Sequence, residues 1–75
     1  MKASLKLTAV FEEAEEGGYI SYIEEIPGVN SQGETLEEAK ANLSEALELI
    51  LETQRMLSRQ ELKDKTVIRE TLELV

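Results

Sequence analysis

One capped, amphipathic helix constrains the fold of this 75-residue chain more than any other feature of its sequence. Thr35 and Glu38 form an S/T-x-x-E capping box, in which each side chain satisfies an otherwise unpaired N–H at the helix start. An apolar stripe at helical spacing follows, made of Leu36, Ala39, Leu43, Ala46, Leu47, Ile50, Leu51 and Leu57. We therefore expect a helix over 35–58, packed against the rest of a single domain that spans 1–75.

The residues that precede the helix predict three strands. The first, over 3–12, alternates apolar and polar residues, and a charged turn with two glycines leads to the second, over 19–25. Pro27 ends the second strand because it lacks an N–H, and a short third strand follows over 29–32. The apolar face of the first strand carries Leu5, Leu7, Ala9 and Phe11, while Val10 falls on the polar face.

The second strand is partly apolar on both faces. Tyr19 and Ile23 share one face, and Ile20 and Tyr22 share the other. One face should cover the core. The other either meets a second subunit or stays exposed, and the pattern favours neither, because single exposed apolar residues are common on protein surfaces.

The region after the helix predicts a polar connection over 58–65, either irregular or with a helical turn around Leu62, and a strand over 66–75. In that strand Ile68, Leu72 and Leu74 share a face with Glu70. An unpaired carboxylate in a core costs several kcal/mol, so we expect Glu70 in a β-bulge or at a sheet edge. The predicted fold is α+β (β-β-β-α-β): a three-stranded antiparallel sheet, a fourth, C-terminal strand in parallel beside the first, and one long helix packed on one face.

The chain contains neither cysteine nor histidine. It therefore has no disulfide and no thiolate nucleophile, it lacks the commonest general base, histidine, and a zinc site is very unfavourable. We expect no catalytic activity, no metal and no cofactor. A single small core leaves roughly 3–5 kcal/mol of net stability without reinforcement, so we expect a homo-oligomer, either a dimer or a tetramer.

The formal net charge of −8 comes from sixteen acidic and eight basic residues. Such a surface repels phosphate, so we expect no direct binding of nucleic acid and a basic protein as the natural partner. No apolar run approaches the roughly 20 residues that span a bilayer, and the first residues lack the apolar segment of a signal peptide. A cytoplasmic location is the expectation.

Two surfaces are candidates for partner binding. Like charges spaced three and four residues apart on one helix face are destabilising, and two apolar residues lie among them. This first surface comprises Glu45, Glu48, Leu49, Glu52 and Met56, and the second is the corner formed by Glu24, Glu25, Pro27 and Gly28. The alternative is an ordinary solvated helix face with scattered apolar residues.

The block from the second strand into the helix follows the pattern Tyr-x-x-Tyr/Ala-x-x-Glu-h-Pro-Gly-h-x-Ser/Thr-x-Gly-x-Thr-h-Glu-Glu-Ala-x-x-Asn-h-x-Glu-Ala, where h is apolar. The residues that meet it are Tyr19, Tyr22, Glu25, Ile26, Pro27, Gly28, Val29, Ser31, Gly33, Thr35, Leu36, Glu37, Glu38, Ala39, Asn42, Leu43, Glu45 and Ala46. This block resembles the N-terminal domain of HicB-type antitoxins, which is similar in fold to a truncated ribonuclease H core.

The resemblance implies a non-catalytic antitoxin domain that neutralises a small basic mRNA-cleaving toxin of the HicA type. Antitoxins of this family usually add a C-terminal DNA-binding segment. The sequence stops at Val75 after the predicted fourth strand, so we do not expect operator binding. The alternatives are an orphan HicB-like domain that binds itself or another protein as an adaptor, with no toxin, and a hydrolase that exploits the ribonuclease-H-like shape.

Overall fold

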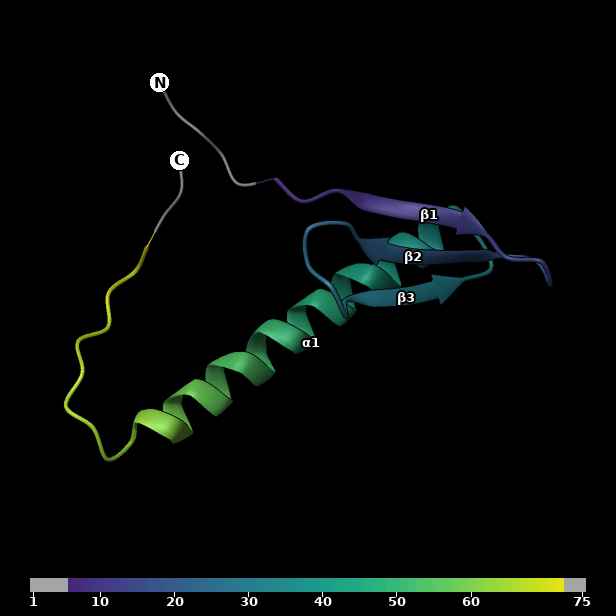
Figure 1. The fold of residues 1–75 in the computed structure, drawn as a ribbon. Coiled ribbons are helices and arrows are strands. Elements are labelled where there is room, and N and C mark those ends of the chain that lie inside the picture. Colours follow the sequence, from purple (N-terminus) through teal and green to yellow (C-terminus); the bar gives the residue numbers. More distant parts are fainter. Residues whose placement is uncertain (1–5, 73–75) are drawn as a thin grey trace, which may run out of the picture.

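The computed structural model describes residues 6–72, which form three strands followed by one helix. The elements are β1 (Ala9–Glu13), β2 (Tyr19–Ile23), β3 (Asn30–Gly33) and α1 (Leu36–Leu62). The strands form one antiparallel sheet in the order β1-β2-β3, and the first half of α1 lies across one face of it (Figure 1). The predicted α+β fold, with its three-stranded antiparallel sheet and long helix, is confirmed.

The register of the sheet follows from a tight hairpin between β1 and β2. The Ala14 N–H donates to the Gly18 carbonyl at 3.0 Å, and Gly17 and Gly18 have φ angles of 100° and 79°. Glycine adopts such angles without a steric penalty, because it has no Cβ. The resulting register places Val10 opposite Tyr22 on the neighbouring strand.

The hydroxyl of Ser21 identifies the face of the sheet that α1 covers. Ser21 is fully buried, and its Oγ donates to the Ala39 carbonyl of α1 at 3.1 Å. Since side chains alternate along a strand, Tyr19 and Ile23 share the helix-facing side, whereas Ile20 and Tyr22 face away from it. The side chain of Ile20 is accordingly exposed.

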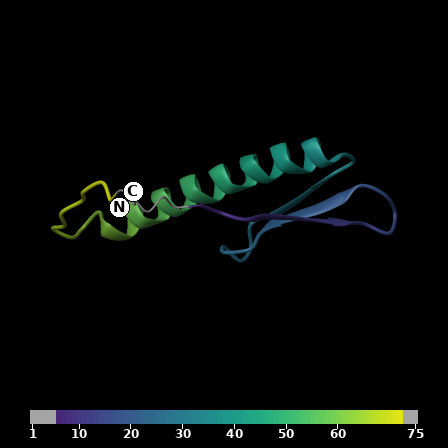
Figure 2. The same cartoon turned by 90° about the horizontal axis from the view of Figure 1, so that it is seen from above.

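The core lies between the sheet and the N-terminal half of α1. Its buried members are Ile23, Val29 and Leu43, and the partly buried residues packed against them are Ile26, Ala46, Leu47 and Ile50. The C-terminal part of the helix extends beyond the ends of the strands and does not lie over the sheet (Figure 2). From residue 51 to residue 72, every residue except Leu62 is exposed.

The helix begins where the sequence predicts and ends later. Thr35 is the N-cap and accepts the Glu38 N–H at 3.1 Å, as the capping box predicts. Glu38 accepts from the N–H of Glu34 rather than of Thr35, at 3.4 Å. The predicted polar connection over 58–65 is wrong at its start, because Arg59, Gln60, Glu61 and Leu62 all continue the helix. These residues favour helix, and Arg59 lies near the negative end of the helix dipole.

The predicted C-terminal strand is wrong over the part of 66–75 that the structure describes. Residues 66–72 run as an extended tail with no strand pairing, and Glu70 is exposed there rather than in a bulge or at a sheet edge. The longer helix carries the tail away from β1, and among residues 6–72 no strand pairs with the outer edge of β1. Residues 73–75, with Leu74, and residues 1–5, with Leu5, lie outside the described residues.

The first strand starts later than the sequence predicts, and its apolar face is only partly covered. Leu7 lies before β1, and its side chain is 39% exposed. Among residues 6–72, no second strand lies on the outer edge of β1 to cover Leu7. Over the same residues, no helix has the length and apolar character needed to cross a membrane.

Candidate protein-interaction surface

The acidic ridge, which we define as Glu45, Glu48, Leu49, Glu52 and Met56, lies on the side of α1 away from the sheet. All five residues are exposed, and the side chains of Leu49 and Met56 are 67% and 70% exposed. Four of the five line one shallow hollow, which Leu51 and Arg55 complete. The structure thus brings together the residues that the sequence singled out on the helix, and adds a cation at the rim.

The charge on this ridge opposes the stability of the isolated helix. Glu45, Glu48 and Glu52 are neighbours on the helix surface, at spacings of three and four residues. Each like-charged pair at such a spacing destabilises a helix by about 0.2–0.5 kcal/mol. An oppositely charged partner would remove this repulsion.

The corner, which we define as residues 24–28, follows β2 and is anchored to the core by the residues on either side of its turn. The Ile26 N–H donates to the Ile23 carbonyl at 3.3 Å, and the Val29 N–H donates to the Ile26 carbonyl at 3.5 Å. Gly28 adopts a φ of 90° in open space. Pro27 and Gly28 are therefore exposed and held in place, as a contact surface requires.

Within the corner, Glu25 has a bonding role that the sequence did not reveal. Both of its carboxylate oxygens are bonded at 2.7 Å by Thr8, one by the backbone N–H and the other by the hydroxyl. These donors, the backbone N–H first, hold the pKa of Glu25 below its ordinary value. Glu25 thereby fastens the start of β1 to the corner, and Glu24 is left as the exposed carboxylate without that bond to Thr8.

The outer face of the sheet is a third exposed surface, built from β1 and β2. Val10 and Tyr22 lie opposite each other on it, and Glu12 lies opposite Ile20. The negative charge of Glu12 raises the pKa of the Tyr22 hydroxyl, with smaller contributions from burial and from Glu24.

Several residues of the recognised pattern hold the junction between β3 and α1. A Cβ on Gly33 would lie 2.4 Å from the Ala39 backbone nitrogen, so only glycine permits this approach of strand and helix. The Asn42 Nδ2 donates to the Gln32 carbonyl at 2.8 Å and so ties α1 to the edge strand. These residues of the pattern therefore stabilise the fold, and they do not by themselves identify a binding partner.

Between residues 6 and 72, no group of three or more acidic side chains converges in a way that could hold a metal ion. Adjacent carboxylates along β1, Glu12 and Glu13, point to opposite faces of the sheet.

The chain belongs to the UPF0150-like family, whose family model matches residues 1–58. The matched range includes the sheet, the corner and the acidic ridge. It ends within α1, before the last turn of the helix and the tail.

Three relatives carry the same family name. The UPF0150 protein ssl0738 of Synechocystis is 56% identical over 52 residues, which cover 69% of each chain. A UPF0150 protein of Thermotoga maritima is 44% identical over 46 residues, 60% of this chain and 61% of that one. The Synechocystis protein ssr1765 is 41% identical over 46 residues, 61% of this chain and 58% of that one. No solved structure shows a significant match.

Proposed function

We propose that this chain is a non-catalytic, antitoxin-like domain that binds and neutralises a small basic toxin of the HicA type. The proposal joins the HicB resemblance of residues 19–46 to the family membership of the chain. The observation that carries it is the acidic ridge, where three neighbouring glutamates surround an exposed leucine beside one shallow hollow.

The physical mechanism is competition for the toxin's RNA-binding face. A protein that binds RNA presents cations to the phosphates, and an acidic surface of matched shape can occupy those cations. Leu49 and Met56 supply apolar contacts, which add affinity that salt does not screen. Because such a toxin acts on mRNA, the proposal entails a cytoplasmic location.

A direct test is capture of the tagged chain from its native host at low and high salt, with mass spectrometry of the co-eluting proteins. The expected partner is a small, basic protein that contains histidine and is released by salt. Its ribonuclease activity should fall when the purified chain is added in equal amount. Recovery of no such protein, or of one whose activity the chain leaves unchanged, contradicts the proposal.

Charge reversal then locates the binding surface. Changing Glu45, Glu48 and Glu52 together to lysine should abolish salt-sensitive binding of the toxin. A matched control changes Glu13, Glu15 and Glu16 to lysine, which alters net charge equally at the exposed end of β1 and in the turn that follows it. If both triple variants lose binding equally, the ridge has no specific role. If neither loses it, the interface lies elsewhere.

The second candidate is an orphan HicB-like domain that associates with itself or serves as an adaptor. The observation that favours it is the exposed apolar surface beyond the core, on residues 51–72. A gene for a small basic histidine-containing protein beside this one would favour the antitoxin. Capture that returns only copies of this chain would favour the orphan.

A further inference from the structure

The C-terminal part of the molecule exposes apolar residues that a single copy does not cover. Leu51 and Leu57 continue the stripe of Leu43, Leu47 and Ile50, and their side chains are 44% and 50% exposed. The radius of gyration is 16.2 Å, whereas a compact chain of this length has roughly 11 Å. We call residues 51–62 the distal half of α1 and residues 63–72 the tail.

The two edges of the sheet differ in how their backbone groups are satisfied. At the β3 edge, Asn42 of α1 bonds the outward carbonyl of Gln32. At the β1 edge, the alternation of an antiparallel pair directs the N–H and C=O groups of residues 9, 11 and 13 outward. No strand pairs with them among the described residues. The β1 edge is therefore the one that can accept another strand.

A small cavity lies beneath that edge. Its volume is about 110 Å³, and its lining is mainly apolar. The residues that line it are Leu7, Ala9, Ile23, Lys40, Leu43, Ser44 and Leu47. An engineered apolar cavity of about 150 Å³ holds benzene, so this one has room for roughly one branched aliphatic side chain.

The tail matches both the edge and the cavity. Ile68 and Leu72 fall on one side of an extended segment, and their side chains are 89% and 86% exposed. Glu70 lies between them on the same side, where a strand added to β1 would bring it towards Lys40. In that arrangement the Lys40 ammonium of the cavity lining lies near the Glu70 carboxylate, which interrupts the apolar pattern of the tail.

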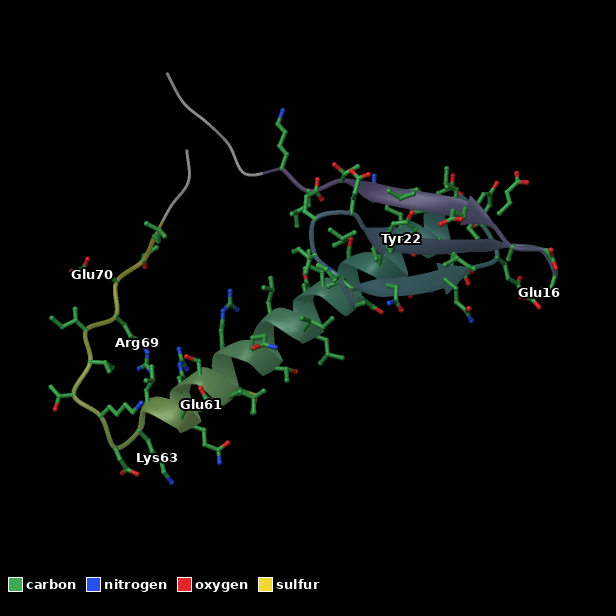
Figure 3. The ribbon with its side chains drawn as sticks, in the orientation of Figure 1. Glu16, Tyr22, Glu61, Lys63, Arg69 and Glu70 are labelled. Atoms are coloured by element: carbon green, nitrogen blue, oxygen red, sulfur yellow. The ribbon has the colours of Figure 1, made fainter. Side chains whose placement is uncertain are left out.

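The tail of the same chain can make only part of this contact while α1 is straight. The helix rises about 23 Å between Leu47, which lines the cavity, and Leu62, which ends the helix. An extended chain needs about seven residues to return that distance, so Ile68 would stop short of the cavity and only Leu72 could reach it. The tail turns back beside the distal half instead, and Figure 3 shows Arg69 and Glu70 far from Tyr22 in the sheet.

A second copy removes the difficulty. In a dimer whose distal halves pack antiparallel along Leu51 and Leu57, Leu62 of one helix lies beside the other helix. It lies at the end of the other copy's core that is nearest to the distal half. Residues 63–65 then span the roughly 10 Å between layers. Because α1 runs opposite to β1 (Figure 1), the incoming tail runs parallel to the β1 that it meets.

We propose that two copies of this chain exchange their tails, residues 66–72 of each pairing with the β1 edge of the other. The exchange buries Ile68 in the cavity, with Glu70 beside Lys40, and covers the distal halves. The glutamates of the acidic ridge lie on the opposite side of α1 and stay exposed, whereas Leu51 at the rim of their hollow is covered. The exchange does not rest on the proposed function.

Disulfide trapping tests the exchange directly, because the chain has no cysteine of its own. Glu12→Cys on the outer face of β1 is mixed with Val67→Cys, Arg69→Cys or Thr71→Cys, and the mixture is oxidised. At least one mixture should form a covalent heterodimer, whereas each variant alone should not. The matched control, Gln32→Cys, lies on the other sheet edge and should give no cross-link with the same three variants.

The oligomeric state completes this test. Sedimentation of the unaltered chain at micromolar concentration should show a dimer. A monomer, a dimer that cross-links no mixture, or one that cross-links equally through Gln32→Cys overturns the proposal. So does a chain carrying both Glu12→Cys and Arg69→Cys that closes a disulfide within itself at high dilution, because its own tail would then occupy the edge.

The charge pair offers a second, independent variant. Lys40→Glu or Glu70→Lys alone should weaken dimerisation about tenfold, since the pair occurs twice in a reciprocal dimer. The double variant should recover most of that loss. If the two single effects simply add in the double variant, Lys40 and Glu70 do not meet. Dimers of the triple ridge variant are expected to be unaffected, which separates this proposal from toxin binding.

Discussion

The two halves of α1 have the same amphipathic pattern and opposite surroundings. In the first half, Ala39 and Leu43 are buried against the sheet, and Asn42 bonds β3. In the distal half, Leu51 and Leu57 continue the same stripe and are exposed in one copy. The difference teaches that helical periodicity shows which side of a helix is apolar, but not what covers it.

The largest expected effect is the difference in unfolding free energy between a truncated leucine in the first half of α1 and one in the distal half. Leu43→Ala should lower the free energy of unfolding by about 2–5 kcal/mol, because it leaves a cavity in a small core. Leu57→Ala should change the unfolding of a single copy by less than about 0.5 kcal/mol. Urea denaturation of both variants at low protein concentration checks this. Equal losses there would mean that the distal half is buried within one copy.

A smaller effect concerns the junction of β3 and α1, which belongs to the first half. Gly33→Ala places a methyl group against the Ala39 backbone and should destabilise the chain by about 1–3 kcal/mol. The exposed neighbour Gln32→Ala serves as the control, with an expected change below about 0.5 kcal/mol. Thermal unfolding with circular dichroism measures both. A harmless Gly33→Ala would show that strand and helix can separate at no cost.

The helix cap should contribute less than the core. Thr35→Ala removes the acceptor of the Glu38 N–H and should cost about 1 kcal/mol, whereas Thr35→Asp should restore most of the loss. Midpoints of urea denaturation compare the two variants. An equal loss in both would indicate that the helix start is held by packing rather than by its cap.

The smallest expected effect is a pH dependence at the start of β1. Because bonds from Thr8 lower the pKa of Glu25 in the folded chain, this carboxylate stabilises the fold above its unfolded pKa of about 4.3. That contribution is lost as the pH falls through the lower folded pKa. The difference in unfolding midpoint between the unaltered chain and Glu25→Gln should therefore shrink on acidification.

A milder variant at the same site checks the cause. Thr8→Ala keeps the backbone N–H that bonds Glu25 and removes the hydroxyl. It should show a weaker pH dependence than the unaltered chain and a stronger one than Glu25→Gln. If all three chains respond to pH alike, the bonds from Thr8 do not set the pKa of Glu25 in solution.

Local signals in the sequence were sufficient for most of the fold. The cap at Thr35, the glycine turn before β2 and the Pro27–Gly28 corner each act within a few residues, so their geometry follows from residue type. The alternation of β2 was equally clear, but both of its faces are partly apolar. Only the bond from Ser21 to the Ala39 carbonyl decides which one meets the helix.

The candidate site was predictable as a set of residues and not as a set of roles. The ridge glutamates share a helix face by spacing alone, and the structure places them around one hollow. Glu25 had the same sequence signal as Glu24, yet it is bonded by Thr8, which lies 17 residues earlier in the sequence, just before β1. Such a bond depends on which strands become neighbours, and no local pattern contains that information.

By itself, the sequence determined the order of the elements, the start of the helix and the acidic character of the surface, because these depend on neighbouring residues. Only the tertiary structure decided that Ser21 rather than Ile20 faces the helix, that Gly33 must lack a side chain and that no strand pairs with the outer edge of β1 among residues 6–72. The physical reason is length. Whether the tail reaches β1 depends on how far a rigid helix extends past a short sheet, a distance that is set across the whole fold.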